Sequence, residues 1–305
     1  MTFIILLQAL FATSFPMGKY LLSFTTPLFL SGARMFVAGS ILLIYQYFAA
    51  SNRFVFHKKH FWTFAQITIL GMYLTYGLRL YALDVLPVWK TSFFYNLSPF
   101  LSALYAYFLF NERLSIKQWF GLSIGLMGML PILISSSPAE ATLGEFLCIS
   151  RYEVFLLISV SLHCYSWILI QKLVRYKNYD TSIVNGICMA TGGVLSLFTS
   201  YIIEGPMNIT DPYAFCKGLT IMIFISNILC HNIYASLLKT YSATFMSFTS
   251  FLSPLFAALY GWAFFQETIS WHFYLSIMIV LTGLYIFYQD ELKNKPDYPN
   301  KEIQL

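Results

Sequence analysis

Apolar runs of about twenty residues, separated by short polar breaks, follow one another along nearly the whole chain. A helix of that length matches the hydrocarbon core of a bilayer. The breaks carry turn-forming residues, as in Thr25-Thr26-Pro27 and Glu204-Gly205-Pro206. The pattern predicts an all-α integral membrane protein with ten transmembrane helices over residues 2–22, 28–50, 62–84, 88–110, 117–135, 154–174, 182–203, 217–238, 243–265 and 272–289.

The composition supports a lipid environment. The chain is 58% hydrophobic and 10% charged, whereas a soluble domain carries about 25% charged residues. The net charge of +5 is small and lies mostly in loops, which argues against nucleic acid as a partner. The apolar run after Met1 has no basic segment before it, so we interpret it as the first span and not as a cleaved signal peptide.

One stretch of the sequence occurs twice. Residues 97–105 begin Leu97-Ser98-Pro99, and residues 252–260 begin Leu252-Ser253-Pro254, 155 positions later. The shared pattern continues to Glu112 and Glu267. A duplicated unit of hydrophobic spans is typical of transporters. We expect a first repeat over residues 1–135, an outer linker over 136–153, a second repeat over 154–289 and a polar tail over 290–305.

The loop charges predict an orientation. With the N-terminus in the cytoplasm, the inner loops and tail hold twelve Lys and Arg residues, and the outer loops hold only Arg151 and Lys217. Positively charged loops stay on the cytoplasmic side, so both termini are expected there. Because each repeat has five spans, an odd number, the second repeat is expected to be inverted relative to the first.

Several motifs resemble the EamA-type repeat of the drug/metabolite transporter superfamily. They are Lys19, Pro27, Ala33-Arg34, Ser98-Pro99, Phe110 to Ser115 and Gly121 to Gly128 in the first unit, and Tyr241 to Pro254, Phe265 to Ser270 and Gly283 in the second. The resemblance implies a central cavity lined by spans one to four and six to nine. One departure is that the second unit has no Arg equivalent to Arg34.

Four basic side chains lie toward the outer ends of the predicted spans, namely Lys19, Arg34, Arg79 and Lys90. Charges in a membrane are costly and therefore mark functional sites, so the cluster suggests a vestibule for a carboxylate or phosphate. Lys19 and Lys90 also fit simple extension of the side chain to the interface. Arg34 and Arg79 are deeper, where substrate, Asp84 or backbone carbonyls are the alternative partners.

The remaining candidates for substrate binding are polar or aromatic side chains inside the predicted spans. They are Tyr76, Tyr95, Asn96, His163, Trp167, Asn185, Asn227, His231 and Tyr234. Each also fits ordinary packing or hydrogen bonding between helices. No Asp or Glu lies in the middle of a span, which argues against proton-coupled cation export. We expect no catalytic residues, metal site or cofactor, because the two histidines have no paired acid.

These observations predict a secondary transporter of a small organic metabolite in the bacterial inner membrane, working by alternating access, with exchange or facilitated movement as the mode of transport. The Phe-rich, charge-poor chain is similar to S-adenosylmethionine/S-adenosylhomocysteine transporters of obligate intracellular bacteria; export of amino acids or other small metabolites is the alternative. An intramembrane enzyme is disfavoured. Gly121 and Gly125 fit packing within one chain, so a monomer is expected, with a dimer as the alternative. Pairing of Cys148 with Cys216 is left open.

Overall fold

Helices make up all the secondary structure in the described residues of the computed structural model, which are 2–49, 57–86, 88–110, 114–128, 151–253, 255–256, 259–260 and 271–293. The predictions that concern Glu112, Pro254, Glu267, Cys148 and the tail after Lys293 therefore fall outside the described residues, as does the side chain of Lys90.

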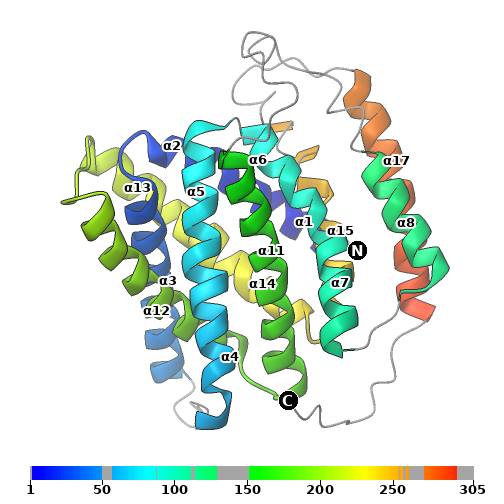
Figure 1. Cartoon of the computed structure of the whole chain (residues 1–305), viewed down its shortest axis with the longest axis horizontal. Coiled ribbons are helices and arrows are strands. Elements are labelled where there is room, and N and C mark those ends of the chain that lie inside the picture. Colours follow the sequence, from blue (N-terminus) through cyan, green and yellow to red (C-terminus); the bar gives the residue numbers. More distant parts are fainter. Residues whose placement is uncertain are drawn as a thin grey trace. The chain divides into compact units, whose positions relative to one another are not determined.

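The elements of the first half are shown from blue to green in Figure 1. They are α1 (Thr2–Ala12), α2 (Ser14–Leu22), α3 (Pro27–Ala49), η1 (Lys58–His60), α4 (Phe61–Gln66), η2 (Ile67–Leu74), α5 (Thr75–Val85), α6 (Val88–Phe94), η3 (Tyr95–Leu97), α7 (Ser98–Phe110) and α8 (Ile116–Met127). The second half contains α11 (Arg151–Gln171), η4 (Lys172–Tyr176), α12 (Thr181–Ile203), α13 (Pro212–Met222), η5 (Ile223–Cys230), α14 (His231–Leu237), α15 (Ala243–Thr249) and α17 (Trp271–Lys293).

Five helical stretches in the described residues are long and apolar enough to cross a membrane, namely Phe3–Leu22, Pro27–Phe48, Arg151–Tyr176, Thr181–Ile203 and Pro212–Leu237. Large apolar side chains are exposed along them, for example Phe198, Tyr201 and Ile202 on α12. Exposed apolar surface of this extent suits contact with lipid. The all-helical prediction thus holds for the described residues.

Some boundaries differ from the predicted ones for local reasons. The first predicted span is divided at Thr13, because Pro16 has no N–H to donate to the carbonyl of Ala12. Helix α13 begins five residues earlier than predicted, at Pro212, where the Asp211 side chain accepts a hydrogen bond from the Ala214 amide and caps the helix. Helix α11 likewise begins at Arg151, inside the expected linker.

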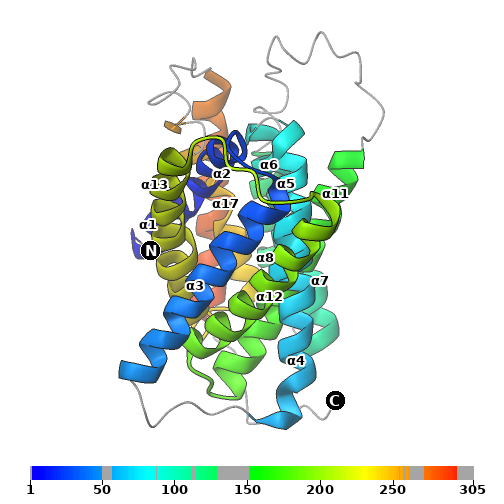
Figure 2. The same cartoon turned by 90° about the vertical axis from the view of Figure 1, so that its left-hand side faces the viewer.

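Helices α3 and α12 pack very closely, with their chains running in opposite directions (Figure 2). Glycines allow the approach, because a Cβ at Gly39 would lie 2.2 Å from the backbone nitrogen of Ala190. On the other helix, a Cβ at Gly193 would lie 2.4 Å from the Phe36 nitrogen. Small residues permit such contact between helices in lipid.

Two π-helical segments occupy corresponding places in the two halves. Segment η2 begins at Ile67 and η5 at Ile223, so their starts are 156 residues apart. The residue after each segment bonds to a carbonyl five positions back: Thr75 Oγ1 donates to Leu70 O at 2.7 Å, and His231 Nδ1 lies 2.7 Å from Ser226 O. Wide turns of this kind are frequent at functional sites.

The acid Glu204 joins α12 to the start of α3. Its carboxylate accepts hydrogen bonds from Thr26 Oγ1 at 2.6 Å, the Leu28 amide at 2.9 Å and Ser200 Oγ at 2.8 Å. Burial alone would raise the pKa of Glu204, but these hydrogen bonds hold it below its ordinary value.

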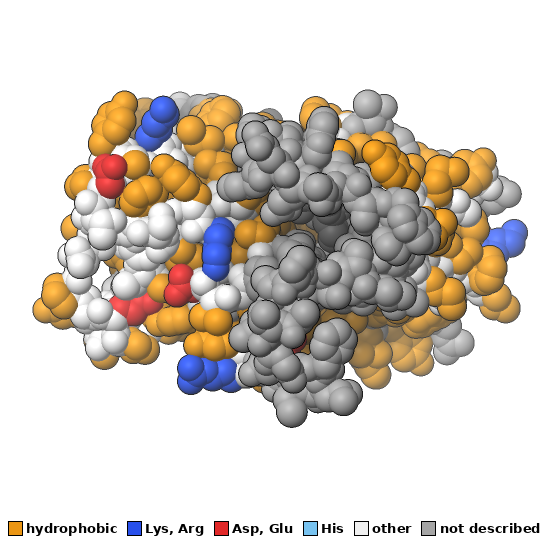
Figure 3. Space-filling model, turned by 90° about the horizontal axis from the view of Figure 1, so that it is seen from above, with side chains coloured by type: hydrophobic (Ala, Val, Ile, Leu, Met, Phe, Trp, Pro, Cys, Tyr) orange, Lys and Arg blue, Asp and Glu red, His pale blue; other side chains and the backbone are white. Residues whose placement is uncertain are grey.

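Charged groups are few on the described surface in the view of Figure 3, where hydrophobic side chains predominate.

The chain divides into two compact units, one of residues 1–112 and 136–269 and one of residues 113–135 and 270–305. In the smaller unit, α8 packs on α17 through glycines: a Cβ at Gly283 would lie 2.7 Å from Gly121 O and 2.8 Å from Gly125 N. These glycines thus serve packing within the chain. Helix α17 continues four residues past the predicted end, and its Asp290 accepts a hydrogen bond from Ser115.

Candidate functional site

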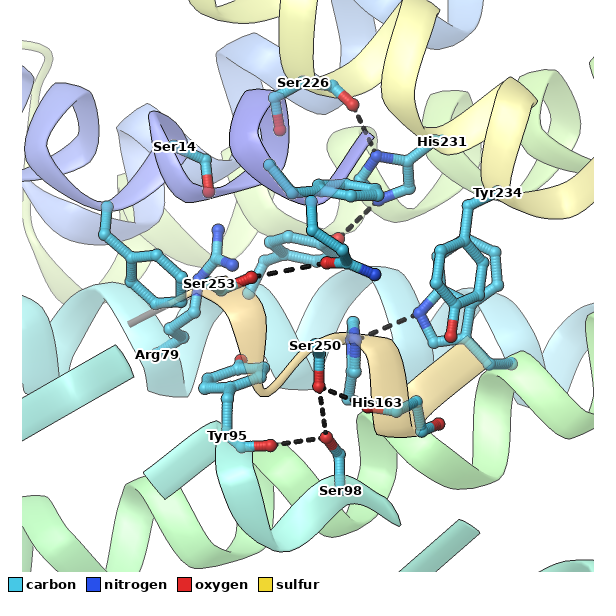
Figure 4. A pocket seen from close by; sticks show the side chains of 16 residues that line it. Ser14, Arg79, Tyr95, Ser98, His163, Ser226, His231, Tyr234, Ser250 and Ser253 are labelled. Carbon is cyan, nitrogen blue, oxygen red and sulfur yellow. Dashed lines mark hydrogen bonds between the residues drawn. The ribbon is translucent and has the colours of Figure 1, made fainter. Parts of the chain in front are cut away.

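A cavity lies within the larger unit, between helices of both halves of the sequence (Figure 4). The empty space among its lining atoms amounts to about 640 Å³ when the part open to solvent is included. Its lining residues come from α1, α2, α5, η3, α7, α11, η5, α14 and the α15 region, and they are Gln8, Phe11, Ser14, Phe15, Tyr76, Arg79, Tyr95, Ser98, His163, Trp167, Ser226, His231, Tyr234, Ser247, Ser250 and Ser253.

The repeated Leu-Ser-Pro motif shapes one wall of this cavity. Pro99 has no N–H, so the carbonyl of Tyr95 lacks its usual helical partner. Ser98 Oγ donates to that carbonyl, and the chain forms the short 3₁₀ turn η3 at Tyr95–Leu97. The turn directs Tyr95 and Ser98 to the cavity, where Ser98 Oγ also lies 3.1 Å from Ser250 Oγ.

A hydrogen-bonded chain crosses between the halves at Tyr76 and His231. The Ser226 carbonyl can only accept, so Nδ1 of His231 carries the hydrogen of that bond. In the neutral ring, Nε2 of His231 is therefore the acceptor, and the Tyr76 hydroxyl donates to it over 2.5 Å. Tyr76 and His231 are also 155 residues apart, the offset of the sequence repeat.

His163 is held as a neutral ring by its neighbour. Trp167 Nε1–H donates to His163 Nε2 at 3.0 Å, and because an indole N–H can only donate, that imidazole nitrogen carries no hydrogen. Trp167 packs on Tyr234 with ring centroids 4.2 Å apart and on His231 at 5.6 Å. These rings form an aromatic wall that suits stacking with a planar base.

Arg79 supplies the positive charge of the cavity. Its Cζ lies 4.6 Å from the ring centroid of Tyr76, 5.4 Å from that of Phe15 and 5.9 Å from that of Tyr95. The side chain is 6% exposed, and its Nε has no hydrogen-bond partner in the described part of the chain. None of the described residues that line the cavity is acidic. An anionic group of a ligand would therefore meet an uncompensated cation.

Arg34 lies against the same tyrosine but does not line the cavity. Its Cζ is 5.0 Å from the centroid of the Tyr76 ring, and the side chain is fully buried. The two arginines thus share Tyr76. Among the described residues, neither forms an ion pair with Asp84, which was one predicted alternative.

The predicted basic vestibule is divided in the structure. Lys19 Nζ donates to the carbonyls of Leu83 at 2.7 Å, Asp84 at 2.5 Å and Leu86 at 3.5 Å. It therefore caps the C-terminal end of α5, a favourable place for a cation, and does not join the arginines.

Three predicted asparagines are buried outside the cavity lining. Asn185 Nδ2 donates to Asn232 Oδ1 at 3.1 Å, and Asn227 Nδ2 lies 3.2 Å from Met35 Sδ. The side-chain amide of Asn96 has no hydrogen-bond partner in the described residues. The first two link helices, as the packing alternative predicts.

Most of the serines that line the cavity were not predicted from the sequence. Ser14, Ser226, Ser247 and Ser250 were not singled out, because serine is common in membrane helices and carries no strong signal. The repeat offset was an available guide, since Gln8 corresponds to His163 at 155 positions and both line the cavity.

The polar groups that line the cavity are of kinds that bind ligands through hydrogen bonds and charge. Among the described lining residues, the side-chain polar groups are one guanidinium, two imidazoles, an indole N–H, an amide and hydroxyls. No group of three or more His, Cys, Asp or Glu side chains in the described residues is placed to hold a metal ion.

Comparisons with known proteins agree with this geometry. The EamA-like transporter family matches residues 1–134 and 150–289. An S-adenosylmethionine/S-adenosylhomocysteine transporter of Chlamydia muridarum is 29% identical over 295 residues, covering 95% of this chain and 92% of its own. The protein of the same description from Chlamydia trachomatis serovar L2 is 29% identical, covering 95% and 90%.

A solved crystal structure with 16% identity has a TM-score of 0.73 over 97% of this chain and 98% of its own, a likeness of fold alone. The matched family covers almost the whole chain, as the sequence motifs predict. The chain belongs to the EamA-like transporter family of multi-pass membrane proteins, and it is a transporter and not an enzyme.

Proposed function

We propose that this protein imports S-adenosylmethionine across the bacterial inner membrane in exchange for S-adenosylhomocysteine. The observation that carries the proposal is 29% identity, over 95% of the chain, to proteins named as transporters of these two compounds. Membership of the transporter family supports the same class of activity.

The chemistry of the cavity fits this pair of ligands. Both compounds contain an adenine, which stacks on aromatic rings such as Trp167 and Tyr234. Both carry an amino-acid carboxylate, which suits the guanidinium of Arg79. The sulfonium of S-adenosylmethionine has no acidic partner among the described lining residues, and the ring faces and hydroxyls there suit it.

The proposed architecture is ten transmembrane helices in two inverted five-helix repeats, with residues 1–135 and 154–289 as the repeats, 136–153 as an outer linker and 290–305 as a cytoplasmic tail. Support comes from the paired π-helical segments η2 and η5 and from the antiparallel contact of α3 with α12. The contact between Tyr76 and His231, at equivalent positions of the repeat, also favours it. The positive loops favour cytoplasmic termini. Such symmetry suits alternating access around a central site.

Uptake into proteoliposomes tests the proposal. Vesicles loaded with S-adenosylhomocysteine are expected to accumulate labelled S-adenosylmethionine faster than protein-free vesicles. Unlabelled S-adenosylhomocysteine is expected to compete, and plain amino acids are not. Uptake no greater than in empty vesicles would remove the proposed substrate, and competition by amino acids alone would favour amino-acid transport.

A further inference from the structure

Arg34 is a buried cation without a matched partner. It is 0% exposed, and neither Nε nor Nη2 has a hydrogen-bond partner in the described part of the chain. Nη1 reaches only the sulfur of Met222, at 3.8 Å, which is a weak acceptor. The guanidinium therefore has most of its donors unsatisfied.

This arrangement is costly unless an anion joins it. Arginine keeps its charge in proteins, and a buried charge without a partner carries a large desolvation penalty. The second guanidinium, that of Arg79, lies against the same Tyr76 ring and adds repulsion. The planar fork of a guanidinium matches a carboxylate in a two-pronged hydrogen bond.

Tyr76 stands between Arg34 and the cavity. Its ring contacts Arg34 and also lines the cavity, whereas Arg34 itself does not. The position of that ring is fixed by the hydrogen bond from its hydroxyl to His231 Nε2. If this bond opens and the ring turns aside, the free donors of Arg34 become accessible from the cavity.

We infer that Arg34 is a second carboxylate-binding residue, screened by Tyr76 and reached by the ligand when the Tyr76–His231 hydrogen bond opens. Arg34 and Arg79 then bind the amino-acid carboxylate from two sides. This inference rests on the proposed function, and it assigns to Arg34 the recognition of the carboxylate specifically, not of the adenosine.

A pair of ligands tests this assignment on purified protein in detergent. S-adenosylhomocysteine is compared with its decarboxylated analogue, which lacks only the carboxylate, in competition with labelled S-adenosylhomocysteine. Arg34→Ala is expected to lower the affinity for S-adenosylhomocysteine by about tenfold or more, because a charged hydrogen bond is lost. The affinity for the analogue is expected to stay within about twofold of wild type.

Two further variants keep the test decisive. Arg34→Lys retains the charge but not the two-pronged hydrogen bonding of a guanidinium. This variant is therefore expected to lose part of the preference for the ligand that carries the carboxylate. It also serves as the test if Arg34→Ala does not fold. Arg151→Ala removes an exposed arginine of α11 and is expected to change neither affinity.

If the Arg34 variants lower the affinity for both ligands by the same factor, the residue has a structural role and the inference is overturned. Unchanged affinity for S-adenosylhomocysteine would also overturn it. If the wild-type protein binds neither S-adenosylmethionine nor S-adenosylhomocysteine, the proposed function fails, and this inference fails with it.

Discussion

Single side chains in this protein are placed by the carbonyls and amides that they satisfy. Lys19 was a candidate for the substrate vestibule, yet its ammonium caps α5. Among the described residues, Nε of Arg79 and both Nε and Nη2 of Arg34 have no hydrogen-bond partner, so these groups remain available to an anion. The depth of a basic residue in a predicted span does not tell whether that residue caps a helix or stays available to a ligand. The outcome depends on whether the C-terminal end of a neighbouring helix lies within its reach.

The hydrogen bonds of Glu204 make its contribution to stability depend on pH. Its folded-state pKa lies below the ordinary value, so its contribution to stability is complete above the unfolded-state pKa and is lost as the pH falls through the folded-state value. Glu204→Gln is expected to lower stability at neutral pH by about 1–3 kcal/mol. The difference from wild type should shrink in acid, as measured by thermal unfolding in detergent from pH 7 to 3. A constant difference across that range would contradict the assignment.

At the level of helices, close backbone contact between α3 and α12 gives a second prediction. Gly39→Ala would place a methyl group 2.2 Å from a backbone atom of the facing helix. We expect it to lower stability by about 1–3 kcal/mol through overpacking, as a reduced midpoint of thermal unfolding in detergent.

Gly18→Ala provides the matched control for that substitution. Its new methyl would meet the flexible Leu83 side chain at 3.1 Å, so a smaller loss is expected. If Gly39→Ala is as stable as the wild type, the contact is looser than described here.

Much of the helical layout was predictable, because long apolar runs have few alternatives in a bilayer. The hydrophobic pattern does not reveal the π-helical segments η2 and η5, since an apolar run looks the same with wide or normal turns. For the site, intramembrane polarity pointed to Tyr76, His163 and His231. It also pointed to Asn185, which bonds another asparagine, because polarity alone does not tell which helix face meets a cavity.

For the whole molecule, the charges of the cavity and its proposed ligands predict electrogenic exchange. S-adenosylmethionine carries one more positive charge than S-adenosylhomocysteine, and the neutral His163 offers no compensating proton. One net charge then crosses per cycle, worth about 2.3 kcal/mol per 100 mV. An inside-negative potassium diffusion potential is expected to speed entry of S-adenosylmethionine into vesicles loaded with S-adenosylhomocysteine.

Homologous exchange of S-adenosylhomocysteine for itself serves as the control, since it moves no net charge and should not respond to voltage. If the heterologous exchange ignores voltage, or if a pH gradient alone drives it, a proton or another ion moves with the ligands and the prediction is wrong.

The hydroxyl contacts between α7 and the α15 region have a mechanical consequence. Ser98 Oγ and Ser250 Oγ lie 3.1 Å apart across the helices, and each can donate its single hydrogen to a carbonyl of its own segment, Tyr95 O or Ser247 O, so at most one of them donates across at a time. Parting these two helices would therefore strand neither hydroxyl in an apolar medium. The contact between α7 and the α15 region can therefore break and re-form many times at small energetic cost.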